Sequence, residues 1–276
     1  MRRLIAVELF KIMKRPRTYI GFGTILFIIL AFQGALAAQG EQIIGLGIQN
    51  LKSVFRFEGE IITVNFVTYM LMTTLIIHVP ILVCLVTGDM ISGEASKGSL
   101  RLLVQRPYSR GQIFMAKWIA GSIYTIALVL FAALVTYFLG LALFGDGDLI
   151  VFRQGINVIE ANDVAWRFVY GFGIGVLAML VVSSLSMMIS SFVNNSIGPI
   201  VGTIAIIIIL NVLSALMTSL LKPVLPYIFT THFTKWQYFF DAELKWGSIS
   251  NAIFVLIGYI LVFTLVGWWN FKRKDI

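Results

Sequence analysis

The residues best suited to chemistry in this 276-residue chain lie in one charged segment, 88–117, which reads GDMISGEASKGSLRLLVQRPYSRGQIFMAK. A polar stretch, 89–97, leads into a short apolar and basic element that ends before Pro107, because a residue that precedes proline disfavours the helical conformation. A second short basic helix, 110–117, follows. Arginines interleaved with leucines suit non-covalent docking to another protein. The alternative is an ordinary connector between two membrane spans.

The chain lacks the groups that enzymatic chemistry would require at membrane depth. No H-E-x-x-H metal pattern occurs, and no Asp or Glu lies in the long apolar windows. His78 could mark a pathway, but a neutral histidine near Pro80 can instead bond a backbone carbonyl that the proline kink frees. The single cysteine, Cys84, rules out an intrachain disulfide and is interpreted as an apolar packing residue. We therefore expect neither an enzyme nor a metal or cofactor on this chain.

The elements that must hold the charged segment are membrane-spanning helices. Hydrophobic residues make up 59% of the chain and charged residues 12%, and the mean hydropathy is +0.92, which excludes an ordinary soluble protein. A bilayer core takes about 20 apolar helical residues to cross. Five windows contain no charged residue: 18–40, 61–88, 118–145, 168–221 and 246–271. Four fit one span each and 168–221 fits two, because Asn194, Asn195 and Pro199 interrupt it.

We therefore predict an all-α membrane protein with six transmembrane helices in a single domain, 1–276. Helices are expected because lipid offers no partner for unpaired backbone groups, and because the apolar runs are too long for barrel strands. The predicted spans are about 19–38, 64–86, 118–142, 168–192, 197–221 and 249–269. The longer connections are a loop at 87–117 on one side of the membrane and loops at 39–60, 145–167 and 222–248 on the other.

The two sides of the membrane differ in basic charge. Segments 1–17, 87–117, 193–196 and 270–276 together hold 14 Lys/Arg and 4 Asp/Glu, whereas the three loops of the other side hold 7 and 9. The positive-inside rule places the first side, with both termini, in the cytoplasm. The expected membrane is a bacterial or archaeal plasma membrane. The formal net charge of +8 is then explained by topology and by contact with the anionic lipid bilayer, and no nucleic-acid partner is expected.

Residues 2–17 are predicted to form an amphipathic helix that lies in the cytoplasmic headgroup layer and bends into the first span at Pro16. The apolar stripe at helical spacing is Ile5, Leu9, Ile12 and Met13, and the residues on another face are Glu8, Lys11 and Arg15. A merely basic topogenic tail is the alternative.

The charged segment resembles the first cytoplasmic loop of ABC-2 type ABC-transporter permeases. The matching residues are GEASKGSLRLL at 93–103, QRPYSR at 105–110, and Lys117. The family pattern is approximately G-E-x-x-x-G-[ST]-[LI]-R-x-L-L-x-x-P-x-[ST]-R, followed by a lysine shortly before the next span. In that family the loop carries the coupling helix, which sits in a groove of a separate ATPase subunit. The resemblance thus implies the ABC-2 (type V exporter-like) fold and two ABC ATPase subunits, which would bind ATP and Mg. It also implies a second permease copy or a paralogue.

The resemblance assigns docking on the ATPase to this loop. The candidate docking residues are Glu94, Lys97, Leu100, Arg101, Leu102, Leu103, Arg106, Pro107 and Arg110. The arginines could pair with acidic groups, while the leucines fill a hydrophobic groove. Glu94 could instead neutralise a nearby helix end within the chain, and the sequence does not decide between these roles. The chain has no G-x-x-x-x-G-K-[ST] phosphate loop, so ATP must bind the partner.

Uncharged polar residues in the fifth span, together with the aromatic segment that follows it, form a candidate substrate pathway. These residues are Thr203, Asn211, Ser214, Thr218 and Phe239. The span residues either line a cavity at a dimer interface or bind helix to helix. The aromatic segment is either an outer gate or an interfacial belt. Because these residues carry no fixed charge, the candidate pathway is suited to an apolar or amphipathic substrate. The expected function is the permease subunit of an ATP-driven exporter, and the alternative is a membrane anchor that recruits an ATPase without moving cargo.

Overall fold

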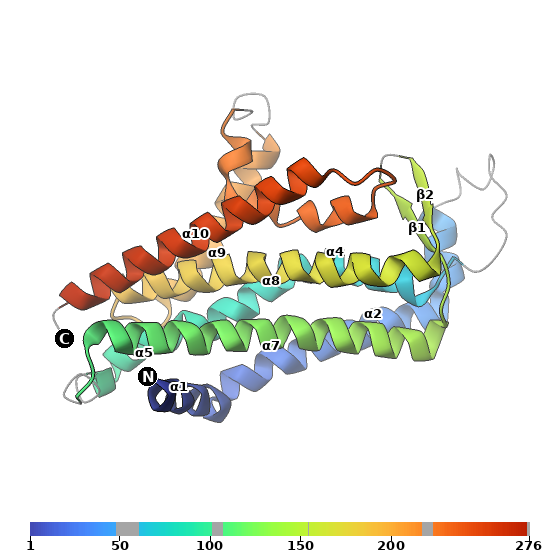
Figure 1. The fold of residues 1–276 in the computed structure, drawn as a ribbon. Coiled ribbons are helices and arrows are strands. Elements are labelled where there is room, and N and C mark those ends of the chain that lie inside the picture. The colour runs from blue at the N-terminus through green and yellow to red at the C-terminus, as the bar shows by residue number, and fades with distance from the viewer. Residues whose placement is uncertain (48–60, 101–106, 154, 217–222, 275–276) are drawn as a thin grey trace.

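The computed structural model describes residues 1–47, 61–100, 107–153, 155–216 and 223–274 (Figure 1). Within these ranges, six helices are long and apolar enough to cross a membrane. They are α2 (Pro16–Gly47), α4 (Val64–Thr87), α7 (Arg110–Phe144), α8 (Ala161–Phe192), α9 (Gly198–Leu216) and α10 (Trp246–Arg273). This confirms the predicted all-α membrane protein with six candidate transmembrane helices.

The spans pack around α8, which contacts α4, α7, α9 and α10. Of the six, α8 and α4 are the most buried, whereas α9 and α10 are the most exposed. The end of α9 and the orange segment that follows it project from one side of the bundle (Figure 1). The outward residues of α9 include Ile208, Ile209 and Val212. This apolar face must be covered by lipid or by another protein.

Both ends of the chain lie at one end of the bundle, close to α1 (Arg2–Lys14) and α5 (Asp89–Ser96) (Figure 1). We call this the elbow end. A two-stranded hairpin of β1 (Leu149–Phe152) and β2 (Ile156–Ile159) lies at the opposite end, which we call the hairpin end. Its strands are antiparallel, with Leu149 opposite Ile159. The short helices η1 (Leu225–Tyr227), η2 (Phe229–His232) and η3 (Lys235–Phe240) precede α10.

Some helix ends agree with the prediction and others differ. As predicted, the apolar run 168–221 divides into two helices, α8 ending at Phe192 and α9 starting at Gly198. Helix α7 begins at Arg110, where a short basic helix was predicted before the third span, and it continues into that span; Ser109 and Gln112 form a capping box at its start. The first candidate span, Pro16–Gly40, ends close to the predicted residue 38; the helix is interrupted at the non-helical Gln39, and helical residues then continue to Gly47.

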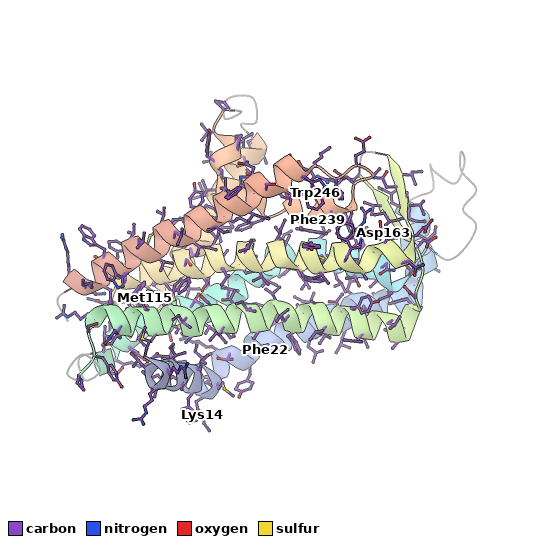
Figure 2. All side chains as sticks on the ribbon, viewed as in Figure 1. Lys14, Phe22, Met115, Asp163, Phe239 and Trp246 are labelled. Atoms are coloured by element: carbon purple, nitrogen blue, oxygen red, sulfur yellow. The ribbon has the colours of Figure 1, made fainter. Side chains whose placement is uncertain are left out.

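Helix α1 bends into α2 at Arg15 and Pro16, as predicted, but its orientation differs from the prediction. The buried face carries Leu4, Glu8 and Ile12, whereas Phe10 is 60% exposed. Lys14 points away from the bundle (Figure 2). The face that carries Glu8 therefore packs against the bundle, and only Ile12 of the predicted apolar stripe is fully buried.

Candidate functional site

A buried ionic cluster joins α1, α5 and α7 at the elbow end. The ammonium of Lys117, whose side chain is 0% exposed, lies 2.8 Å from Glu8 Oε2 and 2.7 Å from Glu94 Oε2. Glu8 and Glu94 are themselves buried. One lysine of α7 is thus held between carboxylates of α1 and α5.

Lys11 completes a four-residue ring with these groups. Its ammonium donates to Glu8 Oε1 at 2.7 Å and to Glu94 Oε1 at 2.9 Å. Burial on its own would lower the pKa of Lys11, but the hydrogen bonds and charges of Glu8 and Glu94 outweigh it, so the pKa is raised. Lys11 therefore stays charged at neutral pH.

A second acidic centre lies beside the ring. Asp89, at the start of α5, pairs with Arg15 at 3.1 Å and with Arg17 at 3.2 Å. Ser196, in the turn between α8 and α9, also donates to Asp89. We name the whole cluster the elbow network. Its members are Glu8, Lys11, Arg15, Arg17, Asp89, Glu94 and Lys117.

The elbow network restricts the movement of α5, which forms the first part of the charged segment 88–117. Buried ions are expensive to remove from water, so each depends on its partners, and loss of one partner typically costs about 3–5 kcal/mol. The pairs connect α1 and α5 to α7 and to the first turn of α2. A displacement of α5 would therefore break these buried ion pairs unless the neighbouring helices moved with it.

The structure changes the assignment of three candidate docking residues. Glu94 and Leu100 are buried within the chain, so neither is free to contact a partner directly. Glu94 has an internal role, as the alternative allowed, but it pairs with the side chains of Lys11 and Lys117 and not with a helix end. Arg110 donates to the carbonyls of Lys272 and Lys274, at 3.4 Å and 2.6 Å, and so holds the end of α10.

The other docking candidates remain available or are not described. Lys97 and Pro107 are both exposed, one before and one after the undescribed residues 101–106. Arg101, Leu102, Leu103 and Arg106 lie outside the described residues.

A second site is a cavity of about 380 Å³ between α4, α9 and η2. Most of its lining is aliphatic, from residues such as Ile76, Pro80 and Ile207. Its polar residues are Asn211, Thr230 and Thr234. Within the described residues, the hydroxyl of Thr230 is buried and has no hydrogen-bond partner.

The predicted pathway residues do not form one surface. Asn211 lines the cavity, whereas the Thr203 hydroxyl is turned to the Pro199 carbonyl within its own helix, at 2.7 Å. Among the residues that the structure describes, the buried hydroxyl of Ser214 has no hydrogen-bond partner. Thr218 falls in the gap between Leu216 and Pro223, where the chain is not described.

Phe239 is not exposed on the surface of the single chain. It is buried and packs against Trp166, Tyr170 and Trp246. Figure 2 shows Phe239 close to Trp246 near the start of α10. The aromatic segment is therefore in part a packing core that joins η3 to α8.

The imidazole of His78 bonds a backbone carbonyl, but a different one from that expected. Its Nδ1 lies 2.8 Å from the Thr74 oxygen, one turn earlier in α4. The carbonyl that Pro80 leaves without a donor belongs to Ile76. The His78 side chain therefore contacts the carbonyl four residues earlier in its own helix, and not the one that Pro80 frees.

Sequence reasoning missed most of the elbow network. Glu8 is the single acid among six basic residues of segment 1–17, and Asp89 immediately follows an apolar span. An isolated acid in a basic segment, and an acid at a span boundary, are signals that could have indicated internal pairing.

The six apolar helices define a multi-pass helical membrane protein. More particularly, the chain belongs to the family described as "Protein of unknown function (DUF2705)", whose model matches residues 26–276. Two proteins of Bacillus subtilis (strain 168) are similar in sequence. "Uncharacterized protein YhcI" is 24% identical over 199 residues, which cover 70% of this chain and 63% of that protein, less than two thirds of its length. "Uncharacterized membrane protein YdbK" is 24% identical over 215 residues, which cover 77% and 84%.

Proposed function

We propose that this chain is the membrane-spanning permease subunit of an ATP-driven exporter of the ABC-2 type. It docks a separate ATPase through the exposed part of loop 97–110 and moves an amphipathic or apolar substrate at a dimer interface. The observation that carries the proposal is the position of the family-like loop motif. The motif starts on α5, and the elbow network fixes α5 to α1 and α7.

The elbow network supports a route for mechanical coupling. Movement of an ATPase against the loop would displace α5, and Glu94 would carry that displacement to Lys117 on α7 and Lys11 on α1. The loop also meets the last turn of α10 through Arg110. Two ATPase subunits, each holding ATP and Mg, would act on two permease chains, homodimeric or with a paralogue.

The proposed topology places the elbow end in the cytoplasm of a prokaryotic cell, with the chain in the plasma membrane. The excess of basic residues on that side supports this orientation. In a Cys84→Ala background, a single cysteine at Ser99 should react with an impermeant maleimide only from the cytoplasmic side. A cysteine at Asn157, on β2, should react only from outside. The opposite labelling pattern would refute both the orientation and the docking surface.

Docking is tested by a double substitution in the loop, Leu102→Asp with Leu103→Asp. If these leucines fill an apolar groove, two buried aspartates should remove ATPase binding, because each uncompensated charge costs several kcal/mol. The measurement is co-purification of MgATP-hydrolysing activity with the tagged chain from its native membranes. Val158→Asp is the control, because it places a charge on an exposed residue of the hairpin end. Unchanged ATPase recovery with the double variant would contradict the proposal.

The cavity favours a transporter over a membrane anchor that only recruits an ATPase. An anchor has no need of a 380 Å³ apolar cavity with three polar residues in its lining. Such a composition is typical of ligand sites, in which a few polar groups orient an apolar molecule. The cavity lies against α9, the span with the most exposed surface. A second chain packed on this surface would close the cavity from outside.

A further inference from the structure

The turn between α8 and α9, residues 193–197, lies against the start of α5 at the elbow end. Ser196 of this turn donates a hydrogen bond to Asp89, the first residue of α5. Asp89 also pairs with Arg15 and Arg17, so the turn is attached to the elbow network. One carboxylate therefore joins the start of α5 to the start of α2 and to the turn that leads into α9.

Ser190, in the last turn of α8, bridges the junction of α4 and α5. Its hydroxyl donates to the Gly88 carbonyl at 2.6 Å and accepts from the Ser92 amide at 2.9 Å. Ser190 and Ser92 are both buried, so these hydrogen bonds are closed to bulk water. A side chain that contacts the backbone groups of a helix in this way fixes the place where the helix changes direction. The junction at Gly88 is therefore held by α8.

Gly88 also lies close to the first residues of α9. A Cβ atom added at this position would lie 2.8 Å from Ser186 Oγ and 3.1 Å from Ile200 Cγ1. Both distances are shorter than ordinary van der Waals contact, so glycine is needed for this close approach. A movement of α5 about Gly88 would therefore displace α9.

The other end of the charged segment reaches the same turn through α10. Arg110 donates to the Lys274 carbonyl at 2.6 Å, and the ammonium of Lys274 donates to the Val193 carbonyl at 3.2 Å. Asn270 of α10 donates to the hydroxyl of Ser191 at 3.1 Å. Both ends of the charged segment are thus connected to the turn from which α9 starts.

We propose that Ser190 and Ser196 are positioning residues that transmit movement of the charged segment to α9, and through α9 to the cavity. The elbow network connects the charged segment to α1 and α7, whereas this second route leads to a span that lines the cavity with Ile204, Ile207 and Asn211. The inference rests on the proposed function for the source of the movement. The connection between α5 and α9 is a property of the chain alone.

The connection is tested in the full chain alone, in detergent, by hydrogen exchange of peptides that contain 88–96 and 198–204. Ser190→Ala removes a donor and an acceptor at the junction, so amides of both peptides should exchange about tenfold faster. Ser183→Ala is the matched control, because Ser183 is a buried serine of the same helix with no hydrogen-bond partner among the described residues. The control should leave both peptides unchanged. Faster exchange confined to 88–96 would overturn transmission to α9.

A second set of variants keeps the test decisive if Ser190→Ala folds poorly. Asp89→Asn removes ion pairs of α5, so exchange should rise in both peptides. In a Ser196→Ala background the same change should still act on 88–96 but should have a smaller effect on 198–204. An effect on 198–204 that is equal with and without the Ser196 hydroxyl would overturn the role of Ser196.

The functional consequence is measured in vesicles that contain the chain with its ATPase. The number of MgATP molecules hydrolysed per fluorescent short-chain phospholipid moved should rise about fivefold in Ser190→Ala and stay constant in Ser183→Ala. The reason is that hydrolysis would still move α5 but would move α9 less. A fall in hydrolysis and transport by the same factor would indicate a merely structural role and would overturn the positioning role. If the unmodified chain moves no phospholipid, the proposed function fails, and the exchange measurements alone decide whether α5 is connected to α9.

Discussion

Replacing Lys117 with methionine should destabilise the folded chain by about 3–5 kcal/mol, the usual cost of removing one partner from a buried ion pair. Lys117 is fully buried and touches both Glu8 and Glu94. Without it, two carboxylates remain in a site closed to water, with only Lys11 as a direct partner of both. Thermal unfolding in detergent, followed by fluorescence, measures the effect. Lys97→Met is the matched control, because Lys97 is exposed and the same charge is lost.

A double-mutant cycle separates loss of the ion pair from loss of packing. Adding Glu94→Gln to Lys117→Met removes one of the stranded charges and should recover part of the lost stability. The two changes together should therefore cost less than the sum of their separate costs. Stability of Lys117→Met equal to that of Lys97→Met would show that the elbow network does not hold α7.

The positions of the spans could be predicted because the bilayer imposes a length and excludes charge. The windows without charge include 61–88 and 118–145, and α4 and α7 cover most of them. The helix ends were less predictable, because they depend on local capping. The short helix predicted at 110–117 joins the third span in one helix, and the capping box of Ser109 and Gln112 fixes its first residue, which hydropathy does not indicate.

The faces of the helices could not be predicted from hydropathy in the same way. In a soluble protein the apolar stripe of a helix faces the core, but in a membrane lipid also accepts apolar side chains. Helix α1 shows the consequence, since Phe10 and Met13 are exposed and Glu8 is buried. Charge pairing across 109 residues of sequence, from Glu8 to Lys117, determines this orientation, and no local pattern reports it.

The hairpin was missed although its signal was present. The residues at 149–152 are LIVF and those at 156–159 are INVI, both rich in β-branched side chains, with Gly155 between them. From the sequence, the whole of 145–167 was assigned to a loop. Gly155 has a φ of +125°, a conformation that favours glycine at this turn.

The loop motif and the cavity illustrate the two limits of site prediction. The motif marked segment 93–110 as a candidate docking site, but it did not indicate that Glu94 and Leu100 would be buried. The cavity required knowledge of where α4, α9 and η2 meet, and only Asn211 of its polar lining was a predicted pathway residue. Thr230 and Thr234 lie in the aromatic segment between α9 and α10, and no sequence pattern distinguishes their hydroxyls as part of a cavity.

Filling the cavity should stop transport without affecting assembly. Asn211→Trp places a large side chain at the lining of the 380 Å³ cavity, so a substrate that passes there would be excluded. We expect MgATP-driven movement of a fluorescent short-chain phospholipid, used as an amphipathic probe, to fall about tenfold or more in vesicles containing the complex. Binding of the ATPase should be unchanged, because the elbow network is untouched. Val201→Trp is the control, since Val201 is an exposed residue of the same helix that does not line the cavity. If Asn211→Trp transports the probe as fast as the control does, the substrate route lies elsewhere. If the unmodified chain binds the ATPase but transports nothing, the chain is better explained as a membrane anchor.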